Sequence, residues 1–189
     1  GDVLDAPGEA LAAVLAERTD ASGTYEFNHA LIRQSLYGEL STPRRVRMHQ
    51  RIGEAIEARY ADRIEAHLTE LAYHFFQAAP GGETERAGAY ARRAGDRAMD
   101  AAAYEEAGRY FDMALQVIDL DENTPPAERG DVLVRLLEAT ELAGTRSAEA
   151  RTRALDQAVE CARLAEDTAL FTRAVMTVGR RSFGGAERA

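Results

Sequence analysis

Small residues recur at helical spacing over residues 85–120, and this pattern constrains the fold more than any other feature of the sequence. The first helix of the stretch is predicted to gather its small residues on one face, made of Ala91, Ala94, Gly95 and Ala98. After a break near 101–103, the second helix is predicted to carry a matching face of Ala107, Phe111, Ala114 and Leu115. Helices with small residues at their crossing approach closely, so the two are expected to pack antiparallel.

The rest of the chain is also predicted to be helical, apart from a short β element at Tyr25–Phe27. The further helices are expected at residues 8–18, 29–39, 41–60, 62–79, 127–143, 147–166 and 168–180. Ser41-Thr42-Pro43 is a typical helix start, and Pro80-Gly81-Gly82 is a typical helix end. The helix over 41–60 is expected to bury a stripe of Met48, Ile52, Ala55, Ile56 and Tyr60. The predicted fold class is therefore all-α.

Composition excludes several classes of protein. All 23 basic residues are arginines, so a P-loop, a kinase strand lysine and Schiff-base chemistry are excluded from this chain. The net charge of −9 argues against nucleic-acid binding. Cys161 is the single cysteine, which fits a reducing compartment. No apolar run approaches the roughly 18 to 20 residues of a membrane span, so a cytoplasmic protein is expected.

Residues 88–121 resemble a tetratricopeptide repeat (TPR), whose unit of about 34 residues carries small residues at set positions. When Ala107 is placed at the alanine of the second repeat helix, Gly95 falls on the glycine of the first. Phe111 then takes the aromatic position. Ala98 and Asp119 stand where the repeat usually has Tyr and Pro. The resemblance implies an array of antiparallel helix pairs.

A second resemblance lies in and after the β element. The residues that carry it are Phe27, His29, Leu31, Ile32, Arg33, Leu36, Tyr37, Arg45 and His49. They resemble the region that follows the nucleotide-binding module of STAND-type ATPases, as in bacterial LuxR-family regulators and multidomain nucleotide cyclases. The resemblance implies a winged-helix-like domain over 1–62 and a TPR-like array, an α-solenoid, over 63–189. Both ends of the chain are expected to be truncated, with the ATP- or ADP-binding module upstream.

The same resemblance gives His29 a possible role in nucleotide binding. In the wider STAND group, the His of a Met-His-Asp motif lies beside a phosphate of the bound nucleotide. The resemblance aligns His29 with that residue, although Asn28 and Ala30 replace the Met and the Asp. It implies that His29 contacts the phosphate in the parent protein and distinguishes ADP from ATP. The alternative is a partly buried His that begins a helix and bonds to the backbone.

Arginines cluster around the start of the helix over 41–60 and form the predicted interdomain or interaction surface. They are Arg33, Arg44, Arg45, Arg47 and Arg51. A phosphate or nucleic-acid patch is the alternative, but the segment lacks interleaved aromatic residues for base stacking. A solvated or interdomain face that pairs with Glu54 and Glu57 is favoured.

Other polar side chains do not predict a site. His67, Glu70 and His74 lack the His-x-x-x-His or Glu-x-x-His spacing of a metal site on one helix, so no metal is expected. They are interpreted as the flank of a core stripe that contains Phe75 and Phe76. No catalytic set is predicted, because no local nucleophile signature is present.

These observations predict a non-catalytic interaction and signal-relay region of a larger ATP-dependent regulator. Its helical array is expected to bind a partner protein, a peptide or a small inducer and to contact its own upstream ATPase domain. No cofactor is expected in the chain itself, and neither nucleic acid nor a membrane is an expected partner. One alternative is a region of a multidomain adenylate or guanylate cyclase, or of an ATPase, whose catalytic domain lies elsewhere. Another is a free-standing TPR-like scaffold.

Overall fold

The computed structural model describes residues 16–18, 25–27, 37–121 and 123–184. The chain divides into two compact units, residues 1–45 and residues 46–189. The first contains a small sheet, and the second contains the helical array.

Two short strands form an antiparallel sheet in the first unit. Strand β1, Ala16–Arg18, pairs with β2, Tyr25–Phe27, so that Ala16 lies opposite Phe27 and Arg18 opposite Tyr25. β2 lies where the sequence predicts a β element. The helix predicted over 8–18 is wrong at its last three residues, because pairing with β2 supplies their backbone with a hydrogen-bonding partner and overrides helix propensity.

Two other expectations for this unit fall mostly outside the described residues. These are residues 8–15 of that same helix and residues 29–36 of the next one. Residues 37–39 are helical, as predicted. The guanidinium carbon of Arg45 lies 5.5 Å from the ring centre of Tyr37, which places a cation over the aromatic face.

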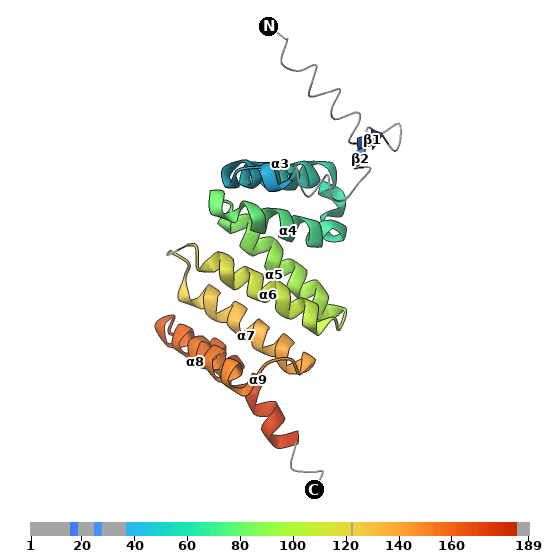
Figure 1. The fold of residues 1–189 in the computed structure, drawn as a ribbon. Coiled ribbons are helices and arrows are strands. Elements are labelled where there is room, and N and C mark those ends of the chain that lie inside the picture. The colour runs from blue at the N-terminus through green and yellow to red at the C-terminus, as the bar shows by residue number, and fades with distance from the viewer. Residues whose placement is uncertain (1–15, 19–24, 28–36, 122, 185–189) are drawn as a thin grey trace. The chain divides into compact units, whose positions relative to one another are not determined.

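Helices follow one another along the chain, most of them in the second unit, and from α4 to α9 each packs against the next (Figure 1). Their bounds are Thr42–Arg59 for α3, Ala61–His67 for η1, Leu68–Ala78 for α4, Ala79–Gly81 for η2, Thr84–Asp100 for α5, Tyr104–Ile118 for α6, Pro126–Ala143 for α7, Ala148–Leu164 for α8 and Thr168–Gly184 for α9. Both η1 and η2 are short 3-10 helices. Consecutive helices run in antiparallel pairs, and α9 also packs against α7. The prediction of an antiparallel helical array is confirmed.

Three helices end in the same way, with one residue in the left-handed conformation. Ala102, Gly144 and Glu166 have φ values of 55°, 68° and 53°. The following residue in each case donates its N–H to a carbonyl five positions back, at 2.8 Å from Ala103 to Ala98 and 2.9 Å from Asp167 to Ala162. This is the hydrogen-bond pattern of a Schellman motif, which satisfies carbonyls at the helix end.

The core of the array consists of three clusters that follow each other along the chain. The first centres on Phe75 of α4 and includes residues of α5, and the second centres on Phe111 of α6. The third joins α7, α8 and α9 around Leu137 and Ala158. The small-residue faces predicted from the sequence lie in the first two clusters, because alanines let the helices approach closely.

The predicted buried stripe of α3 is wrong. The buried residues of this helix are His49 and Gly53, whereas Ala55 is exposed and the other predicted positions, Met48, Ile52, Ile56 and Tyr60, are half-buried. The ring of Phe75 explains the difference, because a β-carbon at Gly53 would lie 2.8 Å from its Cζ atom. At this place Phe75 of α4 supplies the core and Gly53 of α3 leaves a gap for its ring, while Ile56 of α3 packs against the same cluster.

The helix predicted over 62–79 begins differently from expectation. Its first residues form η1, and Arg63 interrupts the helical backbone with φ −138° and ψ 33°. The regular helix α4 starts only at Leu68 and buries Leu68, Leu71, Ala72 and Phe75. Phe75 thus lies in the core, as the sequence predicts, whereas Phe76 is half-buried. No helix in the described part of the chain is long and apolar enough to cross a membrane.

Candidate functional site

The predicted interaction arginines are only partly covered by the structure. His29 and Arg33 lie outside the described residues. Arg44, Arg47 and Arg51 are exposed on α3, as expected for a solvated face. Their role in binding another domain or partner stays a prediction.

The expected acidic partners of these arginines contact α5 instead. Arg86 of α5 lies 3.9 Å from Glu54 and 3.3 Å from Glu57. The hydroxyl of Tyr90, also on α5, donates to Glu57 at 2.6 Å. Burial and this hydrogen bond raise the pKa of Tyr90 to about 12. Glu54 and Glu57 therefore hold α3 to α5, and the expectation that they pair with the arginines of α3 is wrong.

His67, Glu70 and His74 do not form one ligand set. His67 contacts Glu70, with Nδ1 2.7 Å from Oε2, and its ring stacks on Tyr60. His74 points to α3, where its Nδ1 lies 2.9 Å from Nδ1 of His49. Within the described ranges, no group of three or more His, Cys, Asp or Glu side chains is arranged to hold a metal.

The His49–His74 pair is a polar contact inside the α3–α4 interface. His49 is only 3% exposed, and one neutral imidazole donates while the other accepts. Burial lowers the pKa of both side chains; the charge of His74 adds to this effect at His49, whereas Glu70 opposes it at His74. The rings of Tyr73 and His49 form a T-shaped pair, with ring centroids 5.5 Å apart. Burial therefore favours the neutral form of the pair.

A network of charged side chains joins α5, α7 and α9. Arg135 of α7 donates from Nε to Asp131 at 2.8 Å and also contacts Asp96 of α5. Arg173 of α9 donates to the other oxygen of Asp131 at 2.7 Å. A second contact between α5 and α7 is made by Arg92 and Glu128. The network thus links helices that alternate along the chain.

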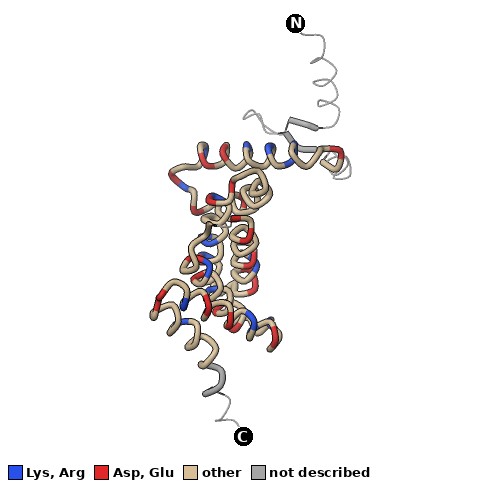
Figure 2. The backbone as a smooth tube through the Cα atoms, turned by 90° about the vertical axis from the view of Figure 1, so that its left-hand side faces the viewer, with Lys and Arg blue, Asp and Glu red and all other residues tan. Residues whose placement is uncertain are grey.

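Asp131 is the centre of this network. Burial alone would raise the pKa of its carboxyl, but hydrogen bonds from Arg173 and Arg135, with their charges, outweigh burial and lower it. Figure 2 shows that acidic and basic residues are interspersed along the helices of the array rather than separated. At Asp131, this mixing produces a carboxylate that stays ionised and holds two arginines.

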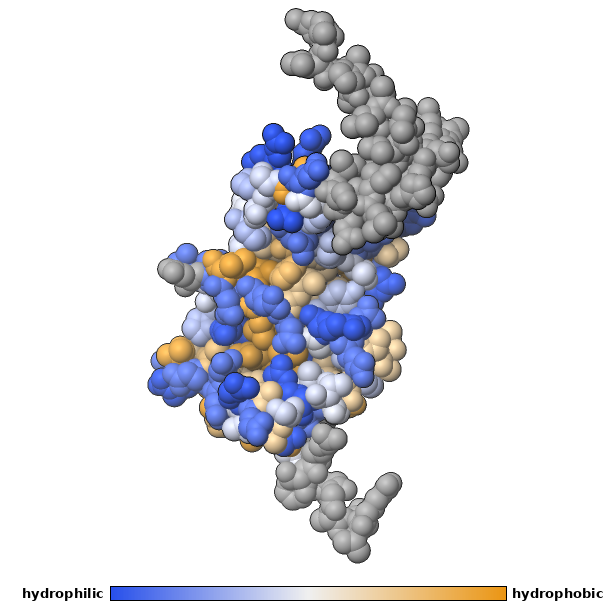
Figure 3. Space-filling model, in the orientation of Figure 1, coloured by the Kyte–Doolittle hydropathy of each residue, from blue (hydrophilic) through white to orange (hydrophobic). Residues whose placement is uncertain are grey.

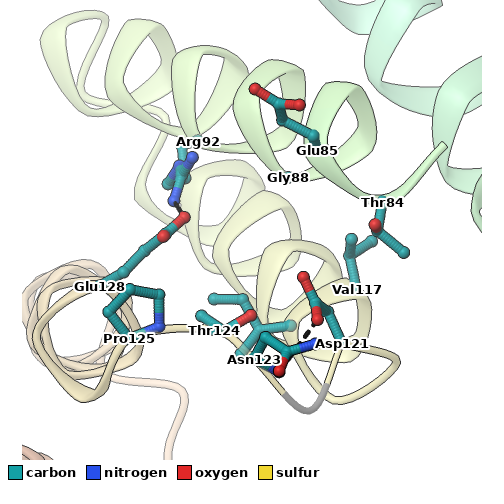
Figure 4. A pocket seen from close by; sticks show the side chains of 11 residues that line it. Thr84, Glu85, Gly88, Arg92, Val117, Asp121, Asn123, Thr124, Pro125 and Glu128 are labelled. Atoms are coloured by element: carbon teal, nitrogen blue, oxygen red, sulfur yellow. Dashed lines mark hydrogen bonds and ion pairs between the residues drawn. The ribbon is translucent and has the colours of Figure 1, made fainter.

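Two pockets lie on the surface of the array. One is formed by the start of α5 and the segment between α6 and α7, where the contact of Arg92 with Glu128 closes one side and Asp121 accepts from the N–H of Asn123 at 3.0 Å (Figure 4). Glu85 adds another negative charge to its wall, so this pocket is acidic. The second pocket lies over α7 between α6 and α8 and combines arginines with buried leucines.

Apolar surface is exposed among hydrophilic side chains over the middle of the array, as Figure 3 shows for one face. Large apolar residues that remain exposed include Leu120 and Leu142, at 55% and 59%. Comparisons with models of protein families, with curated proteins and with solved structures found no match. The sites must therefore be interpreted from their own geometry.

Sequence reasoning missed both the charged network and the His49–His74 pair. The spacing of Asp131 and Arg135, four residues apart on a helix, is a readable signal for one contact of the network. Asp96 and Arg173 come from other helices, 39 and 42 positions from their partners. No local pattern predicts such contacts.

Proposed function

We propose that this chain is a non-catalytic interaction and signal-relay region of a larger ATP-dependent regulator. Residues 1–62 are a winged-helix-like domain in this proposal, and residues 63–189 are a TPR-like array that binds a partner protein, a peptide or a small inducer. ATP or ADP belongs to an upstream module that His29 and the arginines of α3 contact. The protein acts in the cytoplasm.

The observation that carries the proposal is the network of Asp96, Arg135, Asp131 and Arg173. Each helix of the array packs mainly on its neighbours in sequence, so a displacement at one end is passed from helix to helix. The network adds a second route, because it connects α5 to α7 and α7 to α9 directly. A rigid set of stacked helices with such cross-links is suited to transmitting a binding event.

A double-mutant cycle tests the relay. Asp96 and Arg173 are each bound to α7 residues but not to each other, so independent sites would have additive effects. We expect Asp96→Asn and Arg173→Gln to show a coupling of about 0.5 kcal/mol in the free energy of unfolding, because Arg135 and Asp131 connect them. Urea unfolding of the two single variants and the double variant measures this coupling.

Arg163→Gln is the matched control for Arg173→Gln. Arg163 pairs with Glu160 on its own helix, outside the network, so its effect should add to that of Asp96→Asn. Additive energies for Asp96 and Arg173 would remove the basis for the relay. The proposal that the chain is non-catalytic has a separate test. Turnover of ATP or GTP by the purified chain above a buffer blank would contradict it.

A further inference from the structure

The pocket between α6, α7 and α8 has an apolar floor. Leu133 and Leu136 of α7 are 2% and 1% exposed and form its base. Leu115 of α6 is half-buried at the edge, and Ala154 of α8 closes the opposite side. An aliphatic side chain placed here would leave water for an apolar surface, which stabilises binding.

Arginines dominate the rim of the same pocket. Arg129 contacts Asp119, whereas Arg146 lies 3.4 Å from Asp112 and holds it only loosely. Arg153 is exposed, and within the described residues no hydrogen bond or ion pair engages it. Three arginines and two aspartates leave this rim with an excess of one positive charge, on a chain whose net charge is −9.

The pocket between α5 and α7 is a useful contrast. Its arginines are Arg92, Arg93 and Arg135, and its acids are Asp96, Glu128 and Asp131. Each of these arginines already pairs with a carboxylate. Charge is balanced there, so an anionic ligand would have to displace an existing partner. An anionic ligand that binds Arg153 would displace no such partner.

The shape of the pocket favours a segment of polypeptide over a small molecule. Asp112, Gln116, Arg153 and Gln157 are all exposed at its rim, so a ligand would be covered on one side only. Small-molecule sites usually bury most of their ligand. Gln116 and Gln157 each have an amide that donates and accepts hydrogen bonds, which suits the backbone of an extended peptide.

We propose that this pocket binds an acidic peptide segment of a partner protein, with an aliphatic side chain on Leu115 and Leu133 and a carboxylate on Arg153. This inference rests on the proposed function and names the site and the chemistry of the partner. Charge complementarity at the rim and the apolar floor select the same ligand. Neutral or basic peptides would lack the contact with Arg153.

Selection of a displayed library of random peptides on the purified chain tests the proposal. We expect enriched peptides to combine Asp or Glu with Leu, Ile or Val. Synthetic forms should lose at least about tenfold in affinity on Arg153→Glu, since a carboxylate would then face a like charge. The matched control is Arg109→Glu, the same charge change on α6 at an exposed position outside the pocket.

A second arm replaces the acidic residues of the selected peptide with their amides. This change should weaken binding to the unmodified chain, because it removes the contact with Arg153. It should restore part of the affinity for Arg153→Glu, because it removes the repulsion between like charges. The proposal would be overturned if no peptides were enriched or if the enriched peptides lacked acidic residues. Equal affinities of the selected peptide for Arg153→Glu and Arg109→Glu would overturn it as well. The coupling of Asp96 and Arg173 in the free energy of unfolding does not depend on peptide binding. Failure of this inference and failure of the proposed relay can therefore be told apart.

Discussion

A β-carbon added at Gly95 would lie 2.5 Å from Cε1 and 2.8 Å from Cζ of Phe111. The aromatic ring is completely buried and occupies the space that a side chain would need. Gly53 has the same relation to Phe75, with a closest approach of 2.8 Å. At both places a bulky ring on one helix fills the gap left by a glycine on another, so the pairs set how closely these helices approach.

Gly95→Ala should therefore destabilise the array by about 1 to 3 kcal/mol, because the ring is buried and has no free space to move into. Gly88→Ala on the same helix is the control. Its β-carbon would meet only Val117, at 3.9 Å, and alanine favours the helix by about 0.5 to 1 kcal/mol. Urea unfolding should show opposite signs for the two variants, and equal losses would contradict the packing at Phe111.

The His49–His74 pair makes stability depend on pH. Both pKa values lie below the ordinary 6.5 in the folded state, so the folded chain binds fewer protons than the unfolded chain. Stability is then complete above the unfolded pKa and falls as the pH drops below 6.5 towards the lowered values. Glu70 and Tyr73 are the other polar groups beside the pair.

Unfolding by urea between about pH 8 and pH 5 measures this dependence, above the range where most carboxylates titrate. We expect His49→Gln to reduce the slope of stability against pH, because one buried imidazole is gone. His67→Gln is the control, since His67 is partly exposed and contacts Glu70. Equal slopes for His49→Gln and the unmodified chain would show that the pair does not stay neutral.

The ends of the helices are the informative feature at the scale of single elements. Ala102 and Glu166 occupy the left-handed position that Gly144 occupies at the end of α7. A side chain in this conformation is strained by roughly 1 kcal/mol or more, whereas glycine adopts it freely. Two of the three motifs thus have a non-glycine residue in a backbone conformation that glycine adopts more easily.

Ala102→Gly and Glu166→Gly should each stabilise the array by about 0.5 to 1 kcal/mol, because the strain is removed while the hydrogen bonds of the motif remain. Gly144→Ala should cost about as much. Thermal unfolding of the three variants provides the comparison. A loss of stability for Ala102→Gly would mean that the flexibility gained by the unfolded chain outweighs the relieved strain.

These ends also explain which elements the sequence predicts well. The joints at Pro80–Gly82 and Gly144 are readable, because Gly and Pro are the usual residues there. The helix pair α5 and α6 can be predicted from the alanines on its facing surfaces. The buried face of α3 cannot be predicted in this way, because neither Gly53 nor His49 is a typical apolar core residue. Both are buried because Phe75 and His74 of α4 pack against them.

At the scale of the whole array, stability should be distributed unevenly. The three core clusters follow each other along the chain, and each helix packs mainly on its neighbours. Local opening near one end can then occur while the other end stays folded. Leu170 of α9 belongs to the last cluster and is 4% exposed, so it reports on that end.

Leu170→Ala should reduce stability by about 2 to 4 kcal/mol through the cavity that it leaves. We expect faster amide hydrogen exchange in α8 and α9, with little change in α4 and α5. Leu68→Ala, in the first cluster, is the mirror control and should produce the reverse distribution. Uniformly faster exchange in both variants would show that the array unfolds as one cooperative unit.

The carboxylate of Asp131 has one arginine on each oxygen, Arg173 on Oδ1 and Arg135 on Oδ2. An amide is no substitute here, because asparagine has one accepting oxygen and must turn its NH2 group towards a guanidinium, which only donates. The position therefore demands two acceptors rather than merely a polar group. Glutamate would keep both acceptors but move them by a methylene, so Arg173 of α9 and Arg135 of α7 would both have to shift to keep their contacts.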